Sequence, residues 1–292
     1  MTKAKPKTEP EIVGPDGTPI KKIGSSNDFL NTSQLWLGGP GTGKTSTGSA
    51  LGQAAEELGI PDVRPFFFWF EPGHTLVEVE GTNQKCPTCE GKGCEDCDKR
   101  GVMPLVLQSH PTKDPLEEIE KWFEWVAASP FNPLFIDTGN AYFLELASGI
   151  CYSLGVRSAT EAEDRGVTWT RISDTFRSHF GTLRSSGKTL IYLMHSYKQV
   201  KRVRSGEITE TTCKLPGASD GFLKGSVEQI LHFDIVPSDE PDEPDKSIIH
   251  CIPFAGIEAK DRWGILPETI DRGDSPEEGA RAILNCFYDL ED

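Results

Sequence analysis

The sequence has no long apolar run. Across its 292 residues, no stretch approaches the roughly 20 consecutive apolar residues that a membrane-spanning helix needs. The opening stretch "MTKAKPKTEPEIVGPDGTPIKK" also lacks the apolar centre of a secretion signal. We therefore expect a cytoplasmic protein without membrane contact. There is no internal repeat either, which argues against a repeat array.

Positive charge is scarce. The chain has 30 Lys and Arg against 45 Asp and Glu, for a net charge of −15 and a pI near 4.9. An acidic protein is repelled by nucleic acid overall, so any such contact must use a local basic patch. Hydrophobic residues make up 36% of the chain, enough for a core in one large domain or one and a half typical ones.

Cysteines are few, and half of the eight fall within one short stretch. A disulfide framework would spread them more evenly, so their clustering favours a reducing compartment. The stretch "KCPTCEGKGCEDCDKRG" has the pattern C-x2-C-x4-C-x2-C, in which four thiolates can close a tetrahedral Zn²⁺ site. Free thiols or a redox switch are the alternative. The predicted zinc ligands are Cys86, Cys89, Cys94 and Cys97.

The zinc-knuckle segment is predicted to be an insertion, over residues 77–101, between two strands of a larger core. About 25 residues cannot bury enough surface to fold unaided, so the metal would supply their stability. We expect the segment to contact a protein partner or DNA. Its sequence "CEGKGCEDCD" is not basic, which mildly favours a protein.

Apolar strand-like runs alternate with amphipathic helical patterns through most of the chain. This alternation predicts an α/β fold with a mostly parallel sheet and helices on both faces. We expect a disordered tail over 1–30, a core over 31–274 and a C-terminal helix over 275–292. Expected strands lie at 33–39, 64–73, 102–109, 132–139, 189–196, 227–237 and 246–254, and expected helices at 44–59, 114–129, 140–155 and 169–187.

A phosphate-binding loop follows the first strand. "GGPGTGKT" fits G-x-x-x-x-G-K-[ST] and stands between a predicted strand and a predicted helix, as this motif requires. Lys44 would reach the β- and γ-phosphates of a nucleotide, and Thr45 would bind Mg²⁺ through its hydroxyl. The predicted nucleotide-binding residues are Gly38, Gly39, Pro40, Gly41, Thr42, Gly43, Lys44, Thr45 and Ser46.

Three polar residues end other predicted strands. Asp137 in "PLFIDT" is the candidate metal-linked acid, and Glu71 in "FFFWFE" is the candidate that orients or deprotonates the attacking water. His195 in "LIYLMH" could sense the γ-phosphate. Each has a plainer alternative: a solvated carboxylate at a strand end for Asp137 and Glu71, and a buried, hydrogen-bonded imidazole for His195.

This ordered set resembles the core of RecA-like recombinase ATPases, and more closely the phage-encoded RecA-like ATPases of the single-strand annealing group. The resemblance spans about 35–270 and is carried by "LWLGGPGTGKTS", "FFFWFEPG", "PLFIDTGN", "LIYLMHS", "KLPGASDGFLKGSVEQILHFDIV" and "GIEAKDRWGILPETI". It implies that Glu71 is the catalytic base and that Asp137 is the metal-linked acid. His195 would be the γ-phosphate sensor, where recombinases usually carry Gln, and recombinases lack the cysteine insertion.

The same resemblance implies an oligomer. Lys260 and Arg262 fall where the family has cations that reach a neighbouring subunit's nucleotide, so hydrolysis would require a homo-oligomer. A solvated charged turn is the plainer interpretation of "AKDR".

The segment after His195 falls at the family's DNA-binding loop. It holds the strongest basic cluster of the chain, with Tyr197, Lys198, Lys201, Arg202 and Arg204 as candidate DNA contacts. Cations beside an aromatic ring suit single-stranded DNA. Four phosphate contacts would give a log–log salt slope of about −3. The alternative is a hairpin that turns at Ser205-Gly206 with its arginines facing glutamates.

Together these features predict a Mg²⁺-dependent ATPase that uses ATP, Mg²⁺ and Zn²⁺ and acts on single-stranded DNA in recombination or annealing. If it is phage-encoded, it would work in the bacterial host cytoplasm. Two alternatives stay open: a P-loop motor or loader acting on a protein partner, or a kinase; and a nucleotide-switched binding module that uses the zinc knuckle.

Overall fold

The computed structural model describes residues 28–70, 115–203, 206–213, 215–216, 218–238 and 244–288. Several predictions lie outside these residues. They are the tail before residue 28, the strand at 102–109, Glu71, Arg204 and the four clustered cysteines.

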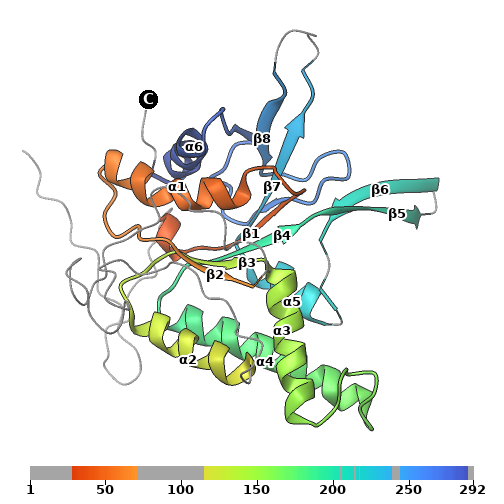
Figure 1. Ribbon diagram of the computed structural model, residues 1–292. Helices are drawn as coiled ribbons and strands as arrows, with labels where there is room; N and C mark the ends of the chain where they lie inside the picture. Colours follow the sequence, from red (N-terminus) through yellow and green to blue (C-terminus); the bar gives the residue numbers. More distant parts are fainter. Residues whose placement is uncertain are drawn as a thin grey trace, which may run out of the picture.

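An eight-stranded sheet organises the described part of the chain (Figure 1). Its strand order is β10-β8-β7-β1-β4-β3-β2, with β9 paired to β7. The run from β7 to β2 is parallel, and β8, β9 and β10 add antiparallel pairs. The strands are β1 (Ser33–Gly38), β2 (Phe66–Trp69), β3 (Leu134–Asp137), β4 (Leu190–His195), β7 (Gln229–Val236), β8 (Lys246–His250), β9 (Lys260–Asp261) and β10 (Thr269–Asp271).

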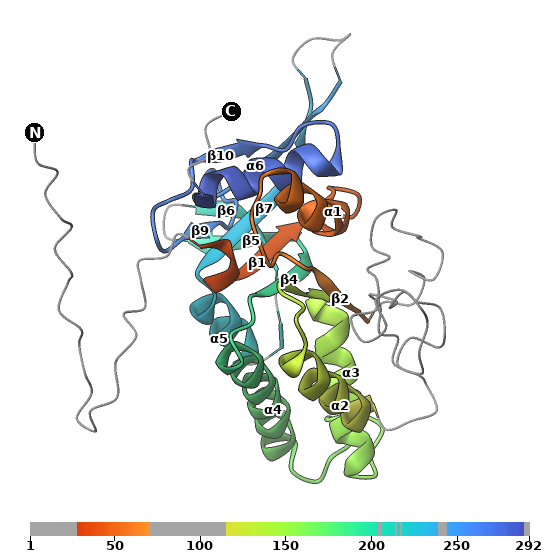
Figure 2. The ribbon, with the colours of Figure 1, turned by 90° about the vertical axis from the view of Figure 1, so that its left-hand side faces the viewer.

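Helices cover both faces of the sheet, as the sequence predicts. In Figure 2 α1 and α6 lie on one side of the strands and α2, α3 and α4 on the other. The helices are η1 (Phe29–Asn31), α1 (Lys44–Glu57), α2 (Pro115–Ala128), α3 (Gly139–Ser153), α4 (Arg165–Ser185), α5 (Ser219–Ser226) and α6 (Pro276–Tyr288). No described helix is long and apolar enough to cross a membrane.

The aromatic run that contains β2 shows why the sheet needs cover on both sides. Phe66 and Phe68 face the core beneath α2, α3 and α4, whereas Phe67 and Trp69 face the core beneath α1 and α6. Phe67 stacks on Phe135 of β3 with ring centroids 4.4 Å apart. Alternate side chains of one strand therefore fill two separate cores, which explains an unbroken aromatic run.

One helix begins earlier than the sequence pattern predicts, and the predicted C-terminal helix is present. α4 begins at Arg165, four residues before the expected start, because the Asp164 side chain caps it by accepting from Val167 N at 3.0 Å. The C-terminal helix α6 packs along α1 and shares its core. Arg281 of α6 also pairs with Glu57 of α1 at 2.6 Å.

The basic segment after β4 forms a hairpin that extends away from the main sheet (Figure 1). Strands β5 (Tyr197–Val203) and β6 (Gly206–Thr212) pair antiparallel over their whole length. Arg202 lies opposite Glu207, with Nε 3.0 Å from Oε1. The hairpin interpretation of this segment is therefore confirmed, except that Gly206, expected in the turn, is the first residue of β6 and pairs with Val203. Contact of the hairpin with DNA stays a prediction.

Candidate nucleotide site

Strand β1 ends in the loop that the motif predicts, and two of its glycines are required by their surroundings. A side chain at Gly38 would come within 2.6 Å of Phe233 O and of Thr42 Oγ1. Gly43, the N-cap of α1, has φ 89°, in the left-handed region that favours glycine. These two positions let the loop close tightly between β1 and α1.

Lys44 places its ammonium inside this loop. Its Nζ donates to Gly38 O and Gly39 O, each at 2.9 Å, and the residue is only 6% exposed. Ser46 closes the first turn of α1 by donating to Gly43 O at 3.0 Å. A buried cation surrounded by the loop, at the amino end of a helix, suits the binding of phosphate.

Thr45 and Asp137 are brought together across the sheet. Thr45 Oγ1 donates to Asp137 Oδ2 at 2.8 Å, and Asp137, the last residue of β3, is 2% exposed. A hydroxyl and a carboxylate are the hard oxygen ligands that Mg²⁺ prefers. Their contact fits the prediction that these two residues share a magnesium site.

His195 stands between the loop and Asp137, because β4 lies between β1 and β3. The register pairs His195 with Gly38 and Leu193 with Asp137, and Ser196 N donates to Gly38 O at 3.1 Å. His195 is partly exposed at the carboxyl end of its strand. A γ-phosphate held by the loop would therefore lie close to the strand end that leads into the hairpin.

The predicted water-activating residue follows the described end of β2. Phe70 N donates to Asp137 O at 2.8 Å, which places Phe70 beside the predicted metal-linked acid. Glu71 is the next residue in the sequence, but it lies outside the described residues.

Lys260 and Arg262 lie at the opposite end of the strands from the phosphate loop. Lys260 pairs with Ile230 near the start of β7, whereas Phe233, further along that strand, lies level with Gly38. Three strand residues separate the levels of Ile230 and Phe233, a distance of about 10 Å, and Arg262 lies further away, with its N bonded to Glu228 O just before β7. Neither cation is therefore beside the phosphate loop of its own chain.

Both cations bond to the carboxyl end of α5. Lys260 Nζ donates to Lys224 O at 2.8 Å and to Val227 O at 2.7 Å, and Arg262 Nη2 donates to Gly225 O at 2.6 Å. Cations are favoured at this end of a helix, where carbonyls lack helical partners. Burial lowers the pKa of Lys260, while Arg262 is exposed.

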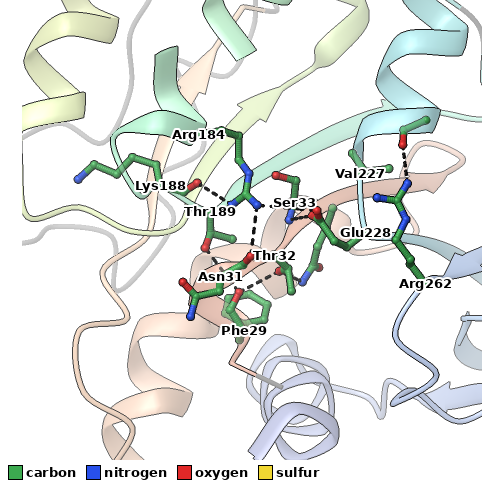
Figure 3. A network of polar contacts seen from close by, with 12 residues as sticks. Phe29, Asn31, Thr32, Ser33, Arg184, Lys188, Thr189, Val227, Glu228 and Arg262 are labelled. Carbon is green, nitrogen blue, oxygen red and sulfur yellow. Dashed lines mark hydrogen bonds and ion pairs between the residues drawn. The ribbon is translucent and has the colours of Figure 1, made fainter. Parts of the chain in front are cut away.

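A polar network lies beside Arg262 at the amino ends of the strands (Figure 3). Glu228 O accepts from Arg262 N at 3.0 Å, and its carboxylate accepts from Ser33 N at 2.5 Å. Arg184 Nη2 lies 3.8 Å from Glu228 Oε1. The network ties β1, α4 and β7 together.

The hairpin presents cations to solvent. Lys198 and Arg202 are exposed on alternate positions of β5, and Tyr197 at its base is 41% exposed. The side chains of Lys201 and Arg204 lie outside the described residues. The structure thus places Lys198 and Arg202 on one face of the hairpin, with Arg202 paired to Glu207.

The sequence analysis missed the group that anchors the hairpin. Lys224 of α5 lies 3.0 Å from Glu258 and 3.3 Å from Asp220, and it donates to Thr212 Oγ1 and Cys213 O at 3.0 and 2.8 Å. Burial alone would lower the pKa of Lys224, but Cys213 and the two carboxylates raise it overall. No local sequence pattern predicts these contacts, because the residues that make them come from three separate segments.

Within the described residues no group of three or more metal-ligating side chains is present. The four clustered cysteines lie outside the described residues, so zinc binding stays a prediction.

Comparison with protein families finds one model, described as an AAA domain, that matches residues 30–263. Comparison with curated proteins gives no significant match. Among solved structures, the chain is similar to the KaiC-like protein PH0186 from the hyperthermophilic archaeon Pyrococcus horikoshii OT3. The identity is 15%, the coverage is 75% of this chain and 77% of that chain, and the TM-score is 0.40.

Proposed function

Because the chain belongs to the AAA domain family, we propose that it is a P-loop ATPase that binds ATP with Mg²⁺ and couples hydrolysis to single-stranded DNA. The observation that carries the proposal is the 2.8 Å contact between Thr45 and Asp137. It joins the end of the phosphate loop to the acid of another strand, as magnesium-dependent nucleotide chemistry needs.

The residues of the site divide the work. Lys44 and the loop amides bind the phosphates, and Thr45 and Asp137 hold Mg²⁺, which would neutralise phosphate charge when bound. Glu71 would orient and deprotonate the attacking water, a role supported by its place directly after Phe70 and by the contact of Phe70 with Asp137. His195 would respond to the γ-phosphate.

DNA contact is proposed for the hairpin. Tyr197, Lys198 and Arg202 are exposed on it, and Lys201 and Arg204 belong to the same segment. Ser196, the residue between His195 and the hairpin, bonds to Gly38 of the phosphate loop. This short path, one hydrogen bond followed by one peptide bond, would let the nucleotide state alter the hairpin's position, in the manner of other phosphate-gated switches.

An oligomer is proposed from the positions of Lys260 and Arg262. Along the strands, Lys260 is about 10 Å from its own phosphate loop, and Arg262, level with Glu228, is further away. If they assist hydrolysis, they must reach the nucleotide of another subunit. The resemblance to RecA-like ATPases, from which the roles of Lys260 and Arg262 come, also supports a phage-encoded recombination protein.

The pattern of four cysteines supports a zinc knuckle that binds a protein partner.

The test is ATP hydrolysis by the purified chain, with and without single-stranded DNA, at low and moderate salt. Stimulation that fades with salt supports the DNA-coupled ATPase, because phosphate contacts weaken as salt rises. Robust turnover that ignores DNA would favour the alternative, a motor or loader directed at a protein partner.

A nucleotide-switched binding module is distinguished by Glu71→Gln. In an ATPase this variant should lose hydrolysis and keep ATP affinity. If the wild-type protein binds ATP with negligible turnover and Glu71→Gln behaves identically, the module is the better description.

A further inference from the structure

Arg272 lies against the phosphate loop although no motif includes it. A methyl group at Gly43 would lie 3.0 Å from Arg272 Nη1, 3.1 Å from Cζ and 3.3 Å from Nε. The three similar distances mean that the guanidinium covers Gly43 with its face. Arg272 follows β10, so it approaches the loop from a segment more than 200 residues away in sequence.

The fold makes room for this side chain at both of its ends. A methyl group at Gly279 of α6 would lie 2.6 Å from Arg272 Cγ, so this glycine admits the stem as Gly43 admits the head. Glycine inside a helix costs about 0.5–1 kcal/mol relative to alanine. The close approach of the arginine stem explains why α6 has a glycine at position 279.

Two bonds to β8 fix the direction of Arg272. Its backbone N donates to Ser247 O at 2.9 Å, and Nη2 donates to Ser247 Oγ at 2.9 Å. The guanidinium is thus held by the rigid sheet and oriented toward Gly43. A flexible surface arginine would have no such support.

The charge of Arg272 has no counterion in the described part of the chain. Its Nε is buried without a hydrogen-bond partner there, and none of the ion pairs in that part includes it. The nearby carboxylate of Glu278 accepts from Asp274 N and Ser275 N at the start of α6. An unpaired, partly buried guanidinium is costly unless an anion arrives.

We propose that Arg272 is a second phosphate-binding cation of the nucleotide site, contacting the polyphosphate of ATP alongside Lys44. This inference rests on the proposed ATP site and extends it to the carboxyl-terminal part of the chain. It assigns to β10 and α6 the role of carrying a positive charge to the loop. The stem of Arg272 lies against Gly279 of α6, and α6 packs on α1, the helix that begins at Lys44.

The test measures the affinity of the full chain for two probes, ATP and inorganic tripolyphosphate, each with Mg²⁺. Arg272→Met keeps the unbranched stem beside Gly279 and removes the charge, and Arg272→Lys keeps the charge. Arg272→Met should lower the affinity for both probes about ten- to a hundredfold, the loss expected for one charge-assisted contact. Arg272→Lys should recover part of that loss.

Arg281→Met is the matched control, because Arg281 lies on α6 and pairs with Glu57. It should leave both affinities unchanged. Thermal unfolding of each variant separates a loss of binding from a loss of fold. If Arg272→Lys has the melting temperature of the wild type but the probe affinity of Arg272→Met, a positive charge at this position is not sufficient for binding.

Two results overturn the proposal. Unchanged affinity for both probes in Arg272→Met would make Arg272 a structural brace. Weakened ATP binding with unchanged tripolyphosphate binding would assign the guanidinium to the nucleoside. If the wild-type chain bound neither probe, the proposed function would fail first, and this inference with it.

Discussion

Thr45 Oγ1 and Asp137 Oδ2 lie 2.8 Å apart, although 92 residues separate them in sequence. We expect Thr45→Ala to lower Mg²⁺-dependent ATP hydrolysis on the order of a hundredfold, because it removes one of two proposed protein ligands of the metal. Thr45→Ser, which keeps the hydroxyl, should retain most activity. Steady-state hydrolysis across a Mg²⁺ titration checks both.

Ser49→Ala is the control on the same helix. Ser49 Oγ donates to Ser46 O and not to any residue of the proposed metal site, so its loss should leave hydrolysis unchanged. Equal activity in Thr45→Ala and wild type at all Mg²⁺ concentrations would remove Thr45 from the site.

Arg202 and Glu207 make a second prediction possible. Their side chains pair at 3.0 Å on the exposed hairpin, with Arg202 89% exposed. If the hairpin binds DNA, Glu207→Gln should tighten single-strand binding by releasing Arg202 and removing a repelling charge. Lys198→Ala with Arg202→Ala should weaken binding and make the log–log salt slope shallower by about 1.4.

Fluorescence anisotropy with a labelled oligonucleotide measures both effects. DNA-free ATP hydrolysis is the internal control and should not change, because none of the three side chains is part of the phosphate loop. Identical affinity in Glu207→Gln, wild type and the double variant would show that this face of the hairpin does not meet DNA.

Sequence patterns predicted much of this fold because the signals were local. The run from Phe66 to Phe70 indicated a strand buried on both faces, and the motif ending in Lys44 and Thr45 fixed the strand, loop and helix around it. The strand order could not be predicted in this way, because no local sequence pattern places β4 between β1 and β3. That arrangement, which brings His195 between Gly38 and Asp137, results from packing among distant segments.

The missed elements were short or assembled from far apart. β9 and β10 have two and three residues, too few to show a period, and α5 has eight. No motif or sequence pattern singled out Lys224 or Arg272. Their partners, Glu258 and Ser247 among them, come from other segments, so only the folded chain shows their roles.

Subunit mixing tests the proposed role of Arg262. Arg262→Ala should be nearly inactive if its guanidinium serves a neighbouring subunit, and Lys44→Ala should be inactive through loss of nucleotide binding. Mixed oligomers of the two should regain hydrolysis, because an intact phosphate loop can then meet an intact Arg262. If mixed oligomers form but every mixing ratio stays inactive, Arg262 does not act across subunits.

His179 predicts how stability depends on pH. This residue of α4 is buried against Phe123 of α2, its Nδ1 lies 2.8 Å from the hydroxyl of Tyr142 on α3, and burial lowers its pKa to about 4. Because the unfolded chain has the ordinary value of 6.5, it takes up a proton first as the pH falls. Above pH 6.5 the histidine is neutral in both the folded and the unfolded chain, so its titration does not reduce the free energy of unfolding there. As the pH falls from 6.5 toward 4, protonation of the unfolded chain lowers that free energy.

The expected loss from this one group is about 2 kcal/mol at about pH 5 and about 3 kcal/mol near pH 4. Urea unfolding at about pH 7.5 and about pH 5 measures it. His179→Gln should remove this part of the pH dependence, whereas Tyr142→Phe should keep it, since burial and not the hydrogen bond lowers the pKa. An unchanged pH dependence in His179→Gln would mean that another group causes the acid sensitivity.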